Sequence, residues 1–478
     1  MMRDSSTTDR ILAVDLDGSL IRGDMIYECL WSAMALDWKA PFIAARSLSR
    51  GIPALKRRLA ELGPVDVTTL PYDPEVIARI EAWRAEGGRT ALVTASDQML
   101  ADQVADHLGL FDEVHGTTPD RNLKGEAKAA LMAERFGDHF TYIGDSTADL
   151  ACWKVSGAAI TVGATAKFRA QVDGINADVT HISPPEAPVW PILKAMRPHQ
   201  WLKNLLVFMP IIADHSFSAL TFFQGLLAFI AFGLVASAGY LLNDLLDLGP
   251  DRAHARKRFR PLASGRLPVP LGTAMVPVLL IAGHLVALTL GWAFVGVIAL
   301  YFCITMSYSL FLKRKPIIDI CVLAGLYTIR IIGGGVATGI DLSIWILAFS
   351  IFLFFSLAAV KRLAELVHMR DSGRVAAAGR GYSVEDLPLT MQMATASGFV
   401  SVLVLALYLN APDIQARYSA PVLLWGVCAL LLYWVSKAVL VASRGEMHDD
   451  PLVYAVTNRT SLICILIMAA LGAGAMLL

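Results

Sequence analysis

Nine long apolar segments in the second part of the chain constrain its fold more than any other feature. They lie near residues 202–217, 220–242, 269–289, 291–312, 317–338, 342–360, 388–409, 419–440 and 460–478. Most have the length of roughly 20 residues that a helix needs to cross a bilayer. The first is short and contains Pro210 and Asp214. The sequence therefore predicts an all-α, multi-pass membrane domain of about nine transmembrane helices.

The composition and the length indicate that the chain has a second domain beside the membrane domain. The chain has 478 residues, of which 55% are hydrophobic and 17% charged, so it is too apolar for a soluble protein and too long for one domain. The formal net charge is zero, so no overall field favours a nucleic acid partner. The six cysteines include no C-x-x-C pair, which argues against a zinc site or a disulfide framework.

Basic residues predict which side of the membrane the connections face. Every second connection is basic, with Arg252, Arg256, Lys257, Arg258, Arg260 and Arg266, then Lys313, Arg314 and Lys315, then Lys361, Arg362, Arg370, Arg374 and Arg380, and then Arg444 and Arg459. The opposite connections hold only Arg417. The apolar run from Ile11 to Val14 is too short for a signal peptide. We therefore expect an inner (cytoplasmic) membrane protein with the basic connections and the N-terminal domain in the cytoplasm.

The first part of the chain has the pattern of an α/β domain. The short β-type runs "RILAVDLDG", "RTALVTAS" and "FTYIGDS" alternate with helical patterns, and each ends in polar residues, as strands do at the ligand-binding edge of a parallel sheet. The Pro-rich stretch "SPPEAPVWP" reads as a stiff linker. We expect a soluble domain at 1–182, a linker at 183–191 and the membrane domain at 192–478.

The polar residues at these strand ends predict a phosphate-handling site. Two acidic strand ends, hydroxyl groups and a lysine are what phosphoryl transfer from a monoester needs. These groups are supplied by Asp15, Asp17, Thr94, Ser96, Lys124, Asp145 and Asp149. Alone, the D-x-D-G sequence at Asp15 is a common turn, and its combination with the stretches "VTAS", "NLKGE" and "YIGDSTADL" carries the prediction.

In these four stretches the chain resembles the phosphatase branch of the haloacid dehalogenase superfamily, over roughly residues 10–180. The resemblance implies a Rossmann-like fold in which Asp15 is the nucleophile and Asp17 the general acid/base. It implies that Thr94 and Lys124 hold phosphoryl oxygens. It also implies Mg2+ on Asp15, Asp145 and the Asp17 backbone carbonyl, with support from Asp149. The alternative is a degenerate fold kept as a scaffold, although no motif position carries a disabling residue.

The stretch from Met25 to Val67 reads as a helical cap inserted after the first motif. Its apolar and aromatic residues have two explanations. They form the core of the cap, or some of them face lipid.

A cluster of charges follows the second apolar segment. In "LLNDLLDLGPDRAHARKRFRPLASG", Asp244, Asp247 and Asp251 stand at i, i+3 and i+7, on one face if the helix continues, with Asn243 beside them. Carboxylates near a bilayer need partners. Magnesium carrying a diphosphate fits them, and the Arg, Lys and His residues that follow would hold the remaining phosphate charge. The alternative is a cytoplasmic loop in which acid and base neutralise each other.

This stretch resembles the first aspartate motif of the UbiA family of membrane prenyltransferases, over roughly residues 190–478. Five further stretches are similar to the subgroup of polyprenyl-phosphate phosphoribosyltransferases: "RPHQWLKN", "DRAHARKRFRPLASG", "YSLFLKRKPIIDI", "YTIRIIGGGVATG" and "VKRLAEL". That subgroup transfers 5-phosphoribose from phosphoribosyl diphosphate to decaprenyl phosphate, in a lipid pathway that feeds arabinan synthesis. The resemblance implies catalytic and metal-binding roles for Asp244, Asp247 and Asp251.

The chain departs from the aromatic prenyltransferases after its fourth span. Those enzymes carry a second aspartate-rich motif there, whereas this chain offers Asp319. Basic residues would instead suit a lipid monophosphate and a sugar 5-phosphate. Candidate substrate-binding residues are Ser96, Lys203, Asn243, Arg252, Arg256, Lys257, Arg258, Arg260, Lys313, Arg314, Arg330, Lys361 and Arg362.

Two of these candidates have structural alternatives. Arg330 lies deep in its span, where it contacts phosphate or pairs with carbonyls or a buried acid. Lys361 also stands four residues before Glu365, the spacing of a plain helical ion pair. The run Gly333 to Gly335 predicts a close approach of backbone or helix.

The expected function is therefore a membrane phosphoribosyltransferase whose fused phosphatase removes the 5-phosphate of the product. The first alternative is a prenyltransferase acting on an aromatic or quinone precursor. The second is a non-enzymatic scaffold or transporter, which would place polar residues at several span centres. The lipid chain length, the phosphatase substrate and whether the chain forms a homo-oligomer are not readable from the sequence.

Overall fold

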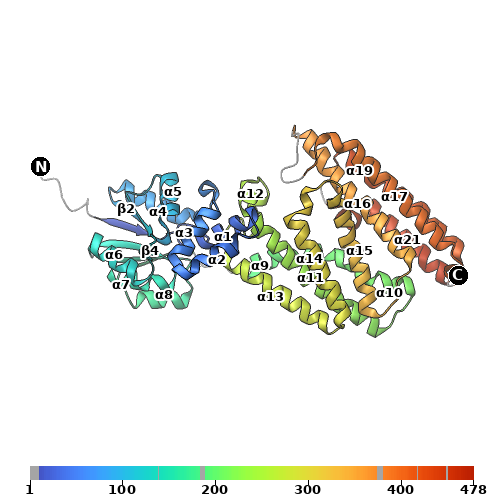
Figure 1. Ribbon diagram of the computed structural model, residues 1–478, viewed down its shortest axis with the longest axis horizontal. Coiled ribbons are helices and arrows are strands. Elements are labelled where there is room, and N and C mark those ends of the chain that lie inside the picture. The colour runs from blue at the N-terminus through green and yellow to red at the C-terminus, as the bar shows by residue number, and fades with distance from the viewer. Residues whose placement is uncertain are drawn as a thin grey trace. The chain divides into compact units, whose positions relative to one another are not determined.

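The computed structural model describes residues 10–137, 139–183, 189–373, 381–416, 418–447 and 450–477 (Figure 1). The chain forms two compact units. The first comprises Met1–Arg197 and Tyr240–Val278, and the second comprises Pro198–Gly239 and Leu279–Leu478. Residues 184–188 of the predicted linker, and the basic residues Arg374, Arg380 and Arg417, lie outside the described ranges.

A six-stranded parallel sheet forms the centre of the first unit, with strand order β3-β2-β1-β4-β5-β6. Its strands are β1 Ile11–Val14, β2 Arg89–Asp97, β3 Glu113–Thr117, β4 Phe140–Gly144, β5 Ala158–Val162 and β6 Val179–Ile182. The central strand β1 pairs in parallel with β2 and β4, and its Leu12, Ala13 and Val14 are fully buried. Burial on both faces is typical of a parallel sheet covered by helices. The predicted α/β fold is confirmed.

Helices connect the strands and carry the expected end signals. They are α4 Pro74–Ala85, α5 Gln98–Leu108, α6 Glu126–Phe136, α7 Leu150–Val155 and α8 Ala166–Asp173. Asp73 and Asp97 cap the first turns of α4 and α5 with their carboxylates. Between β1 and α4 lie α1 Met25–Leu36, α2 Ala40–Arg46 and α3 Ile52–Leu62, which form the helical cap expected from the sequence.

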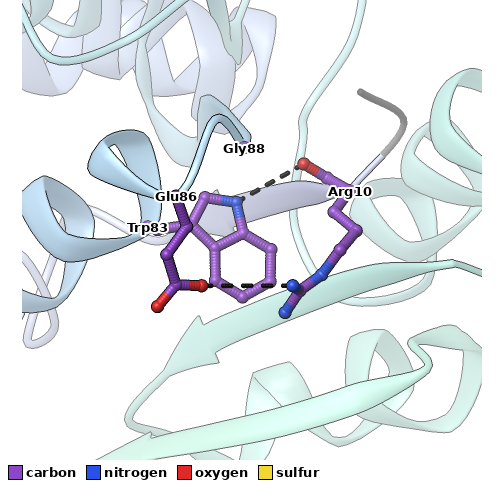
Figure 2. Close-up of a pocket in the computed structure, with 4 residues that line it drawn as sticks. All are labelled: Arg10, Trp83, Glu86 and Gly88. Atoms are coloured by element: carbon purple, nitrogen blue, oxygen red, sulfur yellow. Dashed lines mark hydrogen bonds and ion pairs between the residues drawn. The ribbon is translucent and has the colours of Figure 1, made fainter. Parts of the chain in front are cut away.

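A small pocket in this unit lies away from the predicted chemistry. Arg10, Trp83, Glu86 and Gly88 line it (Figure 2). The Trp83 indole donates to the Arg10 and Arg89 carbonyls, and the Arg10 guanidinium lies 4.6 Å from the Trp83 ring centroid. Arg10 precedes β1 and Arg89 begins β2, so the pocket is at the amino ends of the strands. Ligands of parallel α/β sheets bind at the opposite, carboxyl ends.

Eight helices within the described residues are long and apolar enough to cross a membrane. They are α11 Ala219–Leu246, α13 Val269–Leu288, α14 Trp292–Leu310, α15 Ile318–Thr338, α16 Ile344–Asp371, α17 Leu387–Leu409, α19 Leu424–Ser443 and α21 Arg459–Leu477. Shorter helical segments are α9 Val189–Met196, η4 Pro198–Phe208, α10 Met209–Asp214, α12 Leu248–Ala253, η5 Lys257–Phe259, η6 Leu312–Arg314, α18 Pro412–Gln415 and α20 Pro451–Thr457.

The first predicted span, 202–217, is not among these eight. Its residues form η4 and the short α10 instead. Pro210 stands in the first turn of α10, where its missing N–H costs nothing, and His215 ends α10 in the left-handed conformation with φ 57°. The other eight predicted spans each correspond to one of the eight helices.

Small residues allow close packing in the second unit. A Cβ on Gly334 of α15 would lie 2.1 Å from the Val207 carbonyl of η4, so the close approach predicted for the glycine run is confirmed. Between α16 and α17, the Ser356 hydroxyl donates to the Ala394 carbonyl at 2.6 Å. Such contacts hold helices together where lipid provides no hydrophobic contrast.

Candidate active sites

The turn after β1 brings two carboxylates to the carboxyl edge of the sheet. Asp17 accepts from the Met25 amide at 2.8 Å and from the Ser96 hydroxyl at 2.5 Å. Thr94, also predicted for the site, is fully buried in β2, and its hydroxyl accepts from the Ser96 amide at 3.0 Å. Ser96 therefore contacts the proposed acid/base residue directly.

The environment of Asp17 suits a group that holds a proton near neutral pH. Burial raises the pKa of Asp17 to about 7, and the nearby carboxylate of Asp24 adds to this effect. Burial also raises the pKa of Asp15, to about 6, although the neighbouring Lys128 opposes the shift. A general acid works best when its pKa lies near the working pH.

Lys128, which the sequence analysis did not name, provides a cation beside Asp15, whereas Lys124 was predicted to hold phosphoryl oxygens. The Lys128 ammonium lies 2.9 Å from a carboxylate oxygen of Asp15 and 3.5 Å from one of Asp149. Lys124 is exposed in the loop before α6. Sequence reasoning chose Lys124 because it begins the "KGE" stretch. The signal it missed is that Lys128 lies on the buried face of α6, beside Ala129 and four residues before Met132.

Three carboxylates at this edge form a group suited to a metal ion. One oxygen from each of Asp15, Asp145 and Asp149 lies within 4.8 Å of the others. Burial, and then the charge of Asp15, raise the pKa of Asp145 well above its usual range, so a cation here would relieve the repulsion. Gly18 has φ 74°, and a Cβ there would lie 2.2 Å from Asp145. Hard carboxylate oxygens in this number fit Mg2+.

The aspartate-rich stretch forms a second charged cluster in the first unit. The long helix α11 ends at Leu246, and Asp247 starts the separate helix α12, so the three aspartates do not share one continuous helix. Arg197 binds both carboxylate oxygens of Asp244, at 2.6 and 2.9 Å. Arg260 bridges Asp244 at 3.0 Å and Asp251 at 2.5 Å. The fold therefore brings Asp244 and Asp251 together around one guanidinium.

One oxygen in this cluster has unused binding capacity. Oδ1 of Asp251 is buried and makes no hydrogen bond, and Lys257 approaches it at 3.7 Å. Burial raises the pKa of Asp251, and Arg260 opposes the shift. Asp247 accepts from Asn243 at 3.0 Å. Asp244 and Asp251 thus pair with basic groups, and a buried carboxylate oxygen with spare capacity fits a divalent cation.

Arg252 does not face the aspartates as predicted. Its guanidinium makes a two-pronged ion pair with Glu28 of α1, at 2.9 and 2.7 Å, and also donates to the Ala263 carbonyl. Both charged side chains are buried. The neighbouring Arg256, Lys257 and Arg258 are exposed. The sequence could not reveal Glu28 because this partner lies 224 residues away.

In the second unit, two predicted basic residues share an acid that sequence reasoning missed. Lys203 and Lys361 contact the same oxygen of Asp450, at 2.9 and 3.0 Å. Lys361 therefore pairs with Asp450, whereas the i,i+4 alternative had named Glu365. Burial alone would raise the pKa of Asp450, but the two lysines hold it below its usual range. Asp450 directly precedes Pro451, which starts α20, and lies in no motif quoted above.

The Arg330 side chain binds other groups of the protein, as the structural alternative to a phosphate contact predicted. Its guanidinium donates to the Asn204 side chain at 2.8 Å, to the Tyr301 hydroxyl at 2.9 Å and to the Leu326 carbonyl. It also lies 4.8 Å from the Tyr301 ring centroid.

Arg362 is likewise held by the protein itself. It pairs with Asp319 of α15 and with Glu365 of α16, and the Tyr382 hydroxyl donates to Asp319 at 2.7 Å. Arg362 and Asp319 are almost completely buried. Arg362 and Asp319 therefore neutralise each other's buried charge. The last two predicted residues, Lys313 and Arg314, lie in η6, where Arg314 is exposed.

Comparisons with known proteins agree with two fused parts. A model of the UbiA prenyltransferase family matches residues 205–457, and a model of haloacid dehalogenase-like hydrolases matches residues 12–154. The chain is 38% identical to protein y4nM of Sinorhizobium fredii, over 94% of this chain and 88% of that protein. It is 38% identical to the nodulation protein NoeC of Azorhizobium caulinodans, over 59% of this chain and 92% of that protein.

A further relative has a name that specifies an enzymatic reaction. The chain is 36% identical to the decaprenyl-phosphate phosphoribosyltransferase of Corynebacterium glutamicum, over 46% of this chain and 68% of that enzyme. Together with the eight apolar helices, the matches establish an integral membrane protein with a fused hydrolase-like domain.

Proposed function

The chain belongs to the UbiA prenyltransferase family, and on that premise we propose that it transfers 5-phosphoribose from phosphoribosyl diphosphate to a polyprenyl phosphate. The observation that carries the proposal is the cluster of Asp244 and Asp251 around Arg260, with a buried carboxylate oxygen left without a hydrogen bond. This cluster offers both ligands for a cation and donors for a diphosphate.

In this cluster, the acidic residues would bind the metal ion and the basic residues would bind phosphate. Asp244, Asp247 and Asp251 would hold Mg2+, which when bound supplies positive charge against the departing diphosphate. Arg197 and Arg260 would exchange their carboxylate partners for phosphate oxygens, which guanidinium groups bind through charge-assisted hydrogen bonds. The lipid phosphate is already ionised at neutral pH, so its oxygen attacks C1 of the ribose without a general base.

In the second unit, we propose Lys203 and Lys361 as substrate ligands. Lys203 and Lys361 carry two positive charges against the single charge of Asp450. Such an excess suits a phosphate group. Arg330 and Arg362 are proposed as supports of the fold rather than as phosphate ligands, because their guanidinium groups already bind protein partners.

The hydrolase-like domain would act on the transferred group. The 5-phosphate of the product is a phosphate monoester, the type of bond that this domain's residues are suited to break. Asp15 would attack the phosphorus and form an acyl phosphate, Asp17 would donate a proton to the leaving ribose oxygen, and water would then release phosphate from Asp15. Lys128, Thr94 and the Mg2+ group would hold the phosphoryl oxygens. Fusion keeps a membrane-bound product at high local concentration for this second step.

We also propose that the protein lies in the inner membrane with its hydrolase-like domain in the cytoplasm. The basic connections after α11, α14 and α16 support this orientation, in which η4 and α10 together carry the chain across the membrane once more before α11. Protease treatment of sealed inverted and right-side-out vesicles would test it. Cleavage of the N-terminal domain in right-side-out vesicles would contradict the orientation.

Lipid labelling would test the transferase proposal. Membranes containing the protein would receive Mg2+, polyprenyl phosphate and phosphoribosyl diphosphate labelled in the ribose. We expect label in the organic phase with the wild type and with Asp341→Ala, which changes an exposed acid, and none with Asp244→Ala. No labelled lipid with folded wild-type protein would refute the proposal and turn attention to prenyl diphosphates with aromatic acceptors.

Phosphate release would test the second step separately. We expect Asp15→Ala to accumulate labelled lipid that keeps its 5-phosphate, whereas the wild type loses this group. Equal loss in both proteins would assign the hydrolysis to another enzyme and leave the transferase proposal intact.

A further inference from the structure

The cap of the hydrolase-like domain has a surface that its own fold leaves uncovered. Six large apolar side chains between residues 36 and 52 are 37% to 69% exposed, and they are Leu36, Trp38, Phe42, Ile43, Leu48 and Ile52. We call them the apolar cap surface. Isolated exposed apolar residues are ordinary, but six within seventeen positions form a patch of the kind that marks an interaction site.

The other apolar residues of the cap form its core. Met25, Cys29 and Trp31 of α1 are buried, as are Ala44 of α2 and Leu59 of α3. The cap's apolar residues therefore fall into two sets. One set packs inward and stabilises the three helices, and the other set points outward without a role in that core.

The charges around the apolar cap surface favour an anionic partner. Lys39, Arg46 and Arg50 are exposed within the same stretch, against the single acid Asp37. The Lys39 ammonium lies 5.7 Å from the Trp38 ring centroid, and Trp38 packs edge-on against Phe42. A mixture of aromatic, aliphatic and basic side chains is typical of segments that lie in the interface of an anionic membrane.

One hydrogen bond within the first unit ties the cap to a membrane helix. The Trp31 indole donates to the Thr273 hydroxyl at 2.8 Å, and Thr273 lies in the first turns of the candidate span α13. A Cβ on Gly265, which precedes α13, would lie 2.7 Å from the Arg22 side chain. Leu36 follows Trp31 by five residues along α1, which is about 7.5 Å. The apolar cap surface thus begins fewer than two helical turns from a residue that contacts the start of a span.

We propose that the apolar cap surface lies in the headgroup region of the bilayer, with Trp38 and Phe42 inserted and Lys39, Arg46 and Arg50 on anionic headgroups. Such a contact would hold the hydrolase-like domain at the membrane surface and present a lipid-borne monoester to it. A bilayer is favoured over a second copy of the chain because the surface carries a net positive charge, which would repel its own copy. The proposal does not depend on which lipid is the substrate.

Quenching by spin-labelled lipids in nanodiscs would test the proposal on the full-length chain. Phe42→Cys would carry a compact fluorophore, and Glu81→Cys on α4, also exposed, would be the matched control. The signal of the parent chain, labelled in the same way, would be subtracted to remove the native cysteines. We expect lipids labelled near the headgroup to reduce emission at position 42 and leave position 81 unchanged. Equal quenching at both positions, or none at position 42, would overturn the proposal.

Lipid charge would provide a second, independent readout. Anionic lipid should increase quenching at position 42, and Arg46→Gln with Arg50→Gln should remove that increase. Leu48→Cys would repeat the measurement if the first variant folded poorly. Emission shifted to shorter wavelength without lipid quenching would mean that protein covers the surface, which would refute the bilayer contact and identify a second copy or another partner as the occupant.

Discussion

Replacing Lys128 with methionine should damage both the stability and the phosphatase activity of the first unit. The side chain is 3% exposed, and its ammonium is within 3.5 Å of carboxylate oxygens of both Asp15 and Asp149. Removing one partner of a buried ion pair typically costs about 3–5 kcal/mol because the remaining charge stays buried. Lys124→Met is the matched control, since it removes the same group from an exposed position in the same stretch.

The loss of stability in Lys128→Met should depend on pH with a definite sign. Burial already raises the pKa of Asp15 to about 6 with the lysine present, and without it the pKa rises further. A carboxyl group whose folded pKa lies above its unfolded value stabilises the fold while protonated and loses this contribution as pH rises. In metal-free buffer, the destabilisation should therefore be smaller at pH 5 than at pH 8.

Two assays on the same preparations would check these expectations. Thermal unfolding followed by tryptophan fluorescence should show a lower Tm for Lys128→Met and little change for Lys124→Met. Hydrolysis of p-nitrophenyl phosphate with Mg2+ should fall by roughly 10²–10³-fold in Lys128→Met, the loss typical of removing one group that stabilises transition-state charge. A Lys124→Met variant that loses as much activity as Lys128→Met would refute the assignment.

Three further perturbations have expected outcomes. Glu28→Gln should lower the free energy of unfolding by about 3–5 kcal/mol, and with it the Tm, because the buried Arg252 loses its acid. The double variant Glu28→Leu with Arg252→Leu should recover part of this loss, and a double variant no more stable than Glu28→Gln would contradict the reasoning. Asp319→Asn should destabilise the membrane helices in detergent because Arg362 loses its buried acid, and an unchanged Tm would contradict it. Asp145→Asn should raise the Mg2+ concentration that gives half-maximal phosphatase activity, and an unchanged requirement would exclude Asp145 as a ligand.

Local sequence patterns predicted the two fold classes and the ends of strands and helices that carry the candidate site residues. Strand ends carry Asp15, Asp17 and Asp145 to one edge because parallel strands share a direction, so the periodicity of short runs was enough. Eight spans followed from length and hydropathy alone. The segment predicted at 202–217 forms η4 and α10 instead of one long helix, because the backbone turns at His215 in the left-handed conformation, which hydropathy does not show.

The sequence by itself determined which charged groups exist and near which element ends they lie. Tertiary structure alone decided their partners: Lys128 for Asp15, Glu28 for Arg252, and Asp450 for Lys203. The physical reason is that a buried charge must find an opposite charge or a hydrogen bond wherever the fold provides one, and sequence separation sets no limit on that choice. Motif spacing reports local geometry, whereas the neutralisation of buried charge depends on packing between distant segments.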